Sequence, residues 1–68
     1  MASVARVSTV TSRSTKSFED AIVEGVAHAN KSLRNVSGAW VKEQKAEITE
    51  GKITSWQVTL EVTYVLDD

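Results

Sequence analysis

The chain has 68 residues, no cysteine and a single histidine, and its eight basic and nine acidic side chains leave a formal net charge of −1 at pH 7. This length allows one domain, residues 1–68, whose small core gives only marginal stability by itself. Disulfides and thiolate zinc sites are excluded, and one histidine cannot form a histidine metal site. We therefore expect several copies to associate.

The near-neutral charge gives no whole-molecule field that would attract nucleic acid or an anionic membrane. The longest apolar run is far shorter than the roughly 20 residues that span a bilayer. The N-terminus lacks a charged region followed by an apolar core, so it does not resemble a secretory signal. We expect a cytoplasmic protein without nucleic-acid or membrane partners.

The first third of the chain predicts a short strand and a polar connection. Residues 4–10 are the strand candidate, and residues 11–16, T-S-R-S-T-K, are the connection. Ser14 is a candidate N-cap for the next helix, with Thr15 and Ser17 as competitors, because each hydroxyl can accept from the first free amides. The apolar side of the strand is expected to comprise Val4, Ala5, Val7 and Val10.

Residues 18–33 carry a helical repeat. Apolar residues recur there at spacings of three and four, which places them on one stripe of a helix. The small residues Ala21, Gly25 and Ala29 would allow a close approach to a sheet. His28 lies off the stripe and has no accompanying serine or cysteine motif, so we expect a solvated or subunit-contact residue. The stripe consists of Phe18, Ala21, Ile22, Gly25, Val26, Ala29 and Leu33.

Residues 35–66 predict two long strands joined by a tight turn at Glu50-Gly51, where glycine supplies a positive φ. The second strand alternates strictly from residue 54, which indicates one apolar and one polar face. In the first strand of the hairpin, Ala39 and Val41 share one side, and Trp40, Ala46 and Ile48 share the other. In the second strand, the apolar face holds Thr54, Trp56, Val58, Leu60, Val62, Tyr64 and Leu66, and the polar face holds Ser55, Gln57, Thr59, Glu61 and Thr63.

These elements predict an α+β fold of the βαββ type. The last strand must lie between the other two if both of its neighbours are antiparallel to it, so the strand order is 1-3-2. One helix covers one face of this three-stranded antiparallel sheet. The other face is uncovered in a monomer, and an uncovered face with free edges favours subunit packing.

The chain lacks the motifs that carry most enzyme chemistry: a phosphate loop, a nucleophile elbow or a metal-spaced cluster. We expect no enzyme. Glu43, Glu47 and Glu61 could approach one another across the hairpin, as acid–base chemistry by paired carboxylates would require. The alternating charges of residues 42–47 are more simply explained as a charge-paired strand surface.

Trp56 and Gln57 are the other informative side chains. Trp56 has the parity of the apolar face, which favours a core or interface position. Gln57 lies mid-strand on the polar face, where a carboxamide that both donates and accepts suits the imide edge of a planar ring. The pattern alone favours a simpler role for Gln57, a hydrogen bond across strands or between subunits.

Taken together, these features resemble the dodecin family. The shared features are the element order, the length, the helix ending A-H-A-N-K-S-L-R-N-V, the Gly51 turn and the final W-Q-V-T-L-E-V-T-Y-V-L-D-D. The resemblance implies a small sheet partly wrapped around one helix and assembled into a hollow homododecamer. It also implies non-catalytic storage or buffering of flavins, riboflavin or FMN, bound in pairs between subunits.

The resemblance implies a flavin site with one contact kept and one lost. Gln57 matches the glutamine that holds the polar edge of the ring, but the position of the stacking tryptophan is occupied by Gly38. Trp40 has the same parity about 7 Å farther along, so it can line the same cavity without replacing the missing ring. The G-T-S that precedes the helix in flavin-binding members is replaced by S-R-S, residues 12–14.

Two functions follow from this pattern. The first is a dodecameric shell that binds flavin weakly or not at all, and that binds divalent cations, calcium in particular. Calcium takes about six to eight oxygen ligands, which Glu43, Glu47 or Glu61 of neighbouring subunits could supply. The alternative is a flavin-binding dodecin with altered stacking that uses Gln57 and Trp40.

Overall fold

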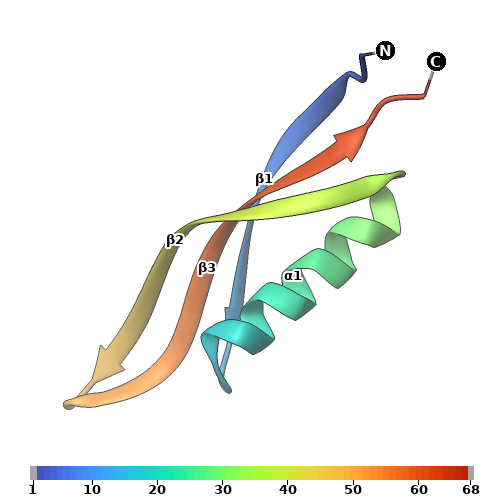
Figure 1. The fold of residues 1–68 in the computed structure, drawn as a ribbon. Helices are drawn as coiled ribbons and strands as arrows, with labels where there is room; N and C mark the ends of the chain where they lie inside the picture. Colours follow the sequence, from blue (N-terminus) through green and yellow to red (C-terminus); the bar gives the residue numbers. More distant parts are fainter. Residues whose placement is uncertain (1, 68) are drawn as a thin grey trace.

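Four elements follow one another in the order strand, helix, strand, strand (Figure 1). In the computed structural model, which describes residues 2–67, they are β1 (Ala5–Ser14), α1 (Phe18–Ser32), β2 (Val36–Thr49) and β3 (Lys52–Val65). β3 lies between β1 and β2 and is antiparallel to both. The predicted α+β fold with strand order 1-3-2 is therefore confirmed.

The core lies where α1 packs on one face of β3. Three β3 residues of the same parity, Val58, Leu60 and Val62, are fully buried there, and Ala21 and Ala29 of α1 complete the buried cluster. Phe18, Ile22, Val26 and Leu33, the larger members of the predicted stripe, pack against this cluster. The predicted apolar stripe is confirmed.

The N-terminus of α1 is capped by Ser17, whose hydroxyl accepts a hydrogen bond from the amide of Asp20 at 2.9 Å. Ser14 supports the cap from β1: its hydroxyl donates to the Asp20 carboxylate at 2.6 Å and accepts from the Lys16 amide at 2.9 Å. Thr15 is exposed. Of the three candidate caps, the structure therefore selects Ser17.

β1 differs from its prediction in length and in the direction of its side chains. Residues 11–14, predicted as a polar connection, continue the strand to Ser14 because each of them pairs with β3. The predicted apolar side is also wrong. Val10 pairs with Leu60 on the helix-covered face, whereas Val7 pairs with Thr63 on the opposite face and is 54% exposed.

β2 changes its parity at a bulge. Val41 pairs with Leu60, but the register shifts before Glu43, and Ala46 then pairs with Trp56. An extra residue in one strand exchanges the faces of the residues that follow it, up to the next register shift, which lies after Glu47. Ala46 therefore shares the helix-covered face with Val41, and its predicted grouping with Trp40 is wrong.

The β2–β3 hairpin closes through Glu50 and Gly51, with φ of 53° and 77°. Two positive φ values define the tight turn that matches the twist of the flanking strands, so the predicted turn is confirmed. The hairpin reaches beyond α1 (Figure 1), and the chain measures 53 × 19 × 13 Å. This shape leaves Ile48 and Ile53 exposed near the turn. Residues 2–67 include no helix that is long and apolar enough to cross a membrane.

Candidate functional site

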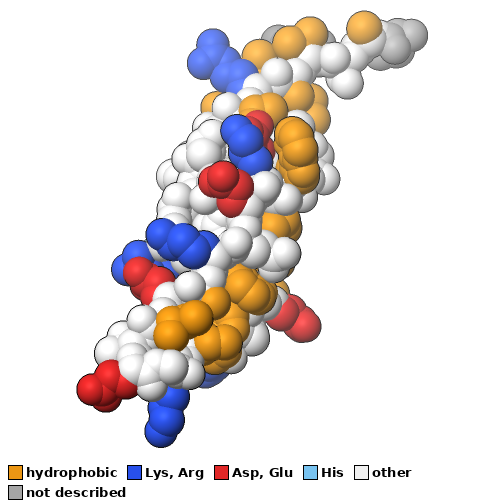
Figure 2. All heavy atoms as spheres, turned by 90° about the vertical axis from the view of Figure 1, so that its left-hand side faces the viewer, with side chains coloured by type: hydrophobic (Ala, Val, Ile, Leu, Met, Phe, Trp, Pro, Cys, Tyr) orange, Lys and Arg blue, Asp and Glu red, His pale blue; other side chains and the backbone are white. Residues whose placement is uncertain are grey.

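The candidate site lies on the face of the sheet opposite α1, here called the outer face. In β3 this face carries the residues whose parity differs from that of the buried core, because side chains alternate along a strand. Figure 2 shows the left-hand side of Figure 1, where the hairpin half of β2 lies, and basic, acidic and hydrophobic side chains all occur along it. The outer-face residues of β2 and β3 include Gly38, Trp40, Glu43, Lys45, Glu47, Ser55, Gln57, Thr59, Glu61 and Thr63.

Gln57 lines a groove of about 260 Å³. It lies next to the β2 bulge, where the register between β2 and β3 shifts after Val41. Gln57 itself is half-buried and pairs with Lys45 of β2. The groove therefore has room for a small ligand against the Gln57 carboxamide. It is lined by Glu43, Gln44, Lys45, Gln57 and Thr59.

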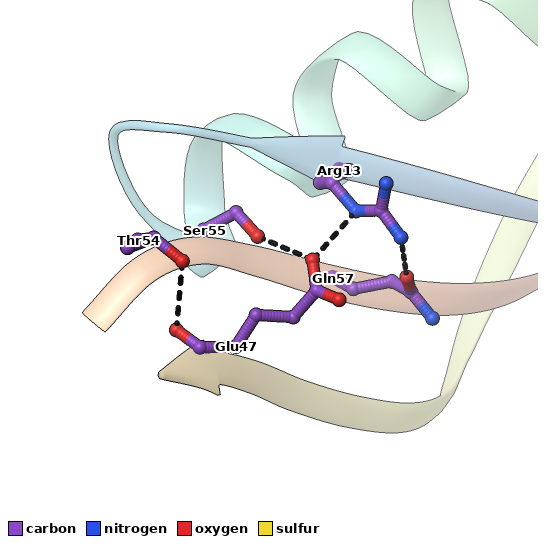
Figure 3. Close-up of polar contacts among 5 residues, drawn as sticks. All are labelled: Arg13, Glu47, Thr54, Ser55 and Gln57. Atoms are coloured by element: carbon purple, nitrogen blue, oxygen red, sulfur yellow. Dashed lines mark hydrogen bonds and ion pairs between the residues drawn. The ribbon is translucent and has the colours of Figure 1, made fainter. Parts of the chain in front are cut away.

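Arg13 joins Gln57 to a second polar group (Figure 3). Its Nη2 donates to Oε1 of Gln57 at 2.7 Å, and its Nε lies 3.1 Å from Oε1 of Glu47. The buried hydroxyl of Ser55 donates to the same Glu47 oxygen at 2.7 Å, and Thr54 donates to the Glu47 backbone carbonyl at 3.3 Å. The guanidinium is thus held at two points, by Gln57 on one side and by Glu47 on the other.

This network lowers the pKa of the Glu47 carboxyl below its ordinary value. The hydrogen bond from Ser55 is the larger cause, and the positive charge of Arg13 is the next. Both favour the charged form of the carboxyl. Glu47 is therefore an anion at neutral pH and provides a fixed negative partner for the guanidinium.

Gly38 and Trp40 lie on the same face as Gln57 but not beside it. Gly38 pairs with Thr63 and Trp40 pairs with Glu61, whereas Gln57 pairs with Lys45. At about 3.3 Å per residue, Trp40 lies about 13 Å and Gly38 about 20 Å along the sheet from Gln57. Trp40 is 65% exposed. Within one chain, therefore, neither Gly38 nor Trp40 lies next to Gln57 as part of one ring-binding site.

The three candidate metal ligands also share the outer face. Glu47 is engaged by Arg13 and Ser55, and Glu61 lies 3.1 Å from Nζ of Lys42. Glu43 pairs with Thr59, which places it diagonally next to Glu61. Within residues 2–67 of one chain, no three acidic or histidine side chains form a group that could hold a metal ion.

Comparison with known proteins identifies the family. The family model for dodecin matches residues 4–67. The chain belongs to the dodecin family. No curated protein matches it significantly.

Solved dodecin structures are similar to the chain over nearly its whole length. The dodecin from Streptomyces davaonensis is 30% identical, with a TM-score of 0.90 and coverage of 97% of both chains. A mutant dodecin from Thermus thermophilus is 31% identical, with a TM-score of 0.90 and coverage of 98% of this chain and 100% of the other. Calcium dodecin from Mycobacterium tuberculosis, described as calcium chelating, is 31% identical, with a TM-score of 0.80 and coverage of 94% and 91%.

Within this dodecin fold, Arg13 is the site residue that sequence reasoning missed. It was assigned to a polar connection, and it meets Gln57 only because β1 continues to Ser14 in register with β3. The available signal was the replacement of G-T-S by S-R-S at residues 12–14. That signal identified the position as altered but gave no contact for the new side chain.

Proposed function

We propose that this chain forms a homododecameric shell that works as a non-catalytic binding or storage protein and binds flavin weakly or not at all. The observation that carries the proposal is the glycine at position 38. It occupies the position where the dodecin resemblance implies a ring-stacking tryptophan. Apart from Gly38 and its two neighbours in the chain, no atom of residues 2–67 lies within 4 Å of a Cβ built there. Because stacking and ring burial each contribute about 1 kcal/mol or more, their loss weakens flavin binding at least about tenfold.

The outer face supports assembly. It is not covered by α1, and large apolar side chains remain exposed on the chain. Such residues favour packing between subunits when they are contiguous. A domain of this length also gains stability most readily by association, because it has no disulfide. The most exposed examples outside the helix are Val4, Val7, Trp40, Ile48 and Ile53.

Two measurements test this proposal. Light scattering is expected to give a mass near twelve times the 7.4 kDa of one chain. A mass near that of one chain would exclude the dodecameric shell. A riboflavin titration is expected to produce little fluorescence quenching at micromolar concentrations. Purified protein that is yellow, or strong quenching in that range, would instead favour the alternative function, a flavin-storing dodecin.

The alternative would use Gln57 and Trp40 with altered stacking geometry. Both residues lie on the outer face, and the separation of about 13 Å within one chain requires them to come from different copies. A Trp40→Ala variant distinguishes this alternative, because it would abolish any quenching that depends on Trp40. Quenching that survives this substitution would exclude Trp40 as the ring contact.

Calcium binding is a second candidate for the shell. Glu43 and Glu61 are diagonal neighbours on the outer face, and the similar M. tuberculosis protein is described as a calcium dodecin. Calcium needs about six to eight oxygens, which symmetry-related copies can supply together. Glu47 is a candidate third ligand, although Arg13 and Ser55 engage it within the chain.

The test for calcium is a comparison of melting temperatures. Chelator-treated protein is expected to gain stability with calcium and not with magnesium, because binding to the folded state alone raises the melting temperature. Replacing Glu43 with Gln removes one candidate ligand and should reduce the calcium effect. Glu24→Gln, on the exposed side of α1, is the matched control.

A further inference from the structure

The orientation of the Gln57 carboxamide is determined by Arg13. Arginine can only donate hydrogen bonds, whereas a carboxamide has one accepting oxygen and one donating NH₂ group. With Nη2 of Arg13 at 2.7 Å, the oxygen of Gln57 must face the guanidinium. The group that Gln57 offers to the groove is therefore its NH₂, a donor.

The guanidinium is held in this position by a chain of contacts. Glu47 binds its Nε at 3.1 Å, and the buried Ser55 holds the Glu47 carboxylate at 2.7 Å. The planar fork of arginine suits two directed contacts of this kind. The bond to Gln57 is also charge-assisted, and such bonds are about twice as strong as neutral ones. A ligand that needs the Gln57 oxygen must compete with this arrangement.

An imide ring edge needs that oxygen. It presents an N–H between two carbonyls, so a carboxamide matches it with two bonds, one accepted by the oxygen and one donated by the NH₂. The oxygen has two lone pairs, but one of them accepts from the charged Arg13. The imide N–H must therefore share the oxygen with a charged donor, and the bond accepted from the ring is weakened while the donated bond remains. A ligand edge that carries only acceptors loses no hydrogen bond, because it needs only donors from the protein. Lys45, which also lines the groove, adds another donor.

We propose that Arg13 determines the ligand specificity of the Gln57 groove: it competes with neutral imide rings for the Gln57 oxygen and favours ligand edges composed of acceptors. The proposal rests on the proposed function for the assembled shell, and it adds that a ligand in the groove contacts Gln57. It concerns a different residue from Gly38, so the two effects are separable by mutation.

Arg13→Thr tests the proposal, with riboflavin as the imide probe. Threonine suits a strand and frees the Gln57 oxygen. The expected result is an increase in riboflavin affinity of about tenfold, the contribution of one additional hydrogen bond to a ligand. Arg6→Thr is the matched control, because it removes the same charge from β1 at a position paired with Tyr64, far from Gln57. Its riboflavin affinity is expected to equal that of the wild type.

Two further measurements identify the mechanism. The double variant Arg13→Thr with Gln57→Ala is expected to lose the gain, because no oxygen is left to accept the ring N–H. Riboflavin methylated at the imide nitrogen is expected to show no gain with Arg13→Thr. A gain that persists in either experiment would overturn the proposal, as would equal affinities of Arg13→Thr and the wild type.

Glu47→Gln provides an independent variant that leaves both Arg13 and Gln57 in place. It removes the anion that holds the guanidinium, so a smaller gain of about threefold is expected. If Arg13→Thr does not assemble, the absence of a gain in Glu47→Gln overturns the proposal. Light scattering on every variant separates this result from a failure of the proposed function. A chain that never assembles, or a wild type that binds riboflavin tightly, contradicts the proposed function.

Discussion

The hydroxyl of Ser55 and the side-chain carboxylate of Glu47 form a 2.7 Å hydrogen bond across the β2–β3 hairpin. The bond lies within the network that positions Arg13 against Gln57. Because this bond and the Arg13 charge both favour the ionised carboxylate, the stability of the hairpin is linked to the protonation of Glu47.

The first prediction concerns acid stability. The pKa of Glu47 is lowered in the folded chain, so its contribution is fully present above the unfolded value of about 4.3 and is lost as pH falls through the folded value. We expect the melting temperature of Glu47→Gln to fall less between about pH 5 and pH 3 than that of the wild type.

The matched control for Glu47→Gln is Glu24→Gln, which removes the same charge from the exposed side of α1, outside the network. Thermal unfolding followed by circular dichroism at constant protein concentration gives the comparison. Parallel slopes for Glu47→Gln and the wild type would show that the network does not link Glu47 to folding.

The second prediction concerns the close contact between α1 and the sheet. A Cβ at Gly25 would lie 2.9 Å from Cδ1 of Leu60 and 3.0 Å from Cβ of Ser12. Leu60 is fully buried, so it has little room to move away. Gly25→Ala gains about 1 kcal/mol of helix propensity, but overpacking costs about 1–3 kcal/mol. We expect a net loss of about 1 kcal/mol in the free energy of unfolding.

Urea unfolding at one protein concentration measures this loss. The reverse change at an exposed helix position, Ala27→Gly, is the control, because it reports helix propensity without a packing contact. It should lower stability by about 1 kcal/mol. An increase in the stability of Gly25→Ala would mean that the sheet can accommodate the extra methyl group.

The third prediction concerns the cap of α1. Ser17→Ala removes the hydroxyl that accepts from the Asp20 amide, and the loss of an N-cap typically costs about 1 kcal/mol. Thr15→Ala is the control, since Thr15 is exposed and does not cap the helix. Its stability is expected to remain within about 0.5 kcal/mol of the wild type. Equal losses in the two variants would contradict the assignment of the cap to Ser17.

Much of the fold follows from local patterns. The strict alternation of β3 predicted that Val58, Leu60 and Val62 share a face, and these are the apolar β3 residues that the structure buries. The stripe at spacings of three and four likewise predicted the buried side of α1. Both signals are local, because the residue period of a strand or a helix determines which side chains lie on the same face.

The errors arise where strand pairing decides the outcome. Ala46 changes face because of a bulge, and a bulge depends on the register with β3 rather than on the residues of β2 alone. Residues 11–14 are polar on both faces, a composition typical of a connection, yet pairing with β3 extends the strand through them.

The site was predictable to the same extent as the strands that form it. Gln57 and its polar face follow from the alternation of β3. The contact between Arg13 and Gln57 joins residues 44 positions apart, and it requires the length and register of β1, which the sequence pattern did not provide. Composition alone cannot show that an arginine engages a particular carboxamide.

The last prediction restores the missing ring. Gly38 lies in β2 on the outer face, and apart from its two neighbours in the chain no described residue has an atom within 4 Å of a Cβ built there. Gly38→Trp therefore adds a side chain without an overlap at Cβ, and tryptophan also suits a strand better than glycine. Under the proposed function, stacking and ring burial should raise riboflavin affinity at least about tenfold.

A fluorescence titration with riboflavin checks this gain, and light scattering confirms that the variant still assembles. Thr49→Trp, at the hairpin end of β2, is the control for a new exposed ring that lies elsewhere on the same strand. Equal affinity of Gly38→Trp and the wild type in intact shells would show that the absent ring is not what weakens flavin binding.

Gly38 and Arg13 lie about 20 Å apart along one sheet and act on different parts of the ligand. Their gains are therefore expected to multiply in the double variant Gly38→Trp with Arg13→Thr, since distant sites contribute additively to the free energy.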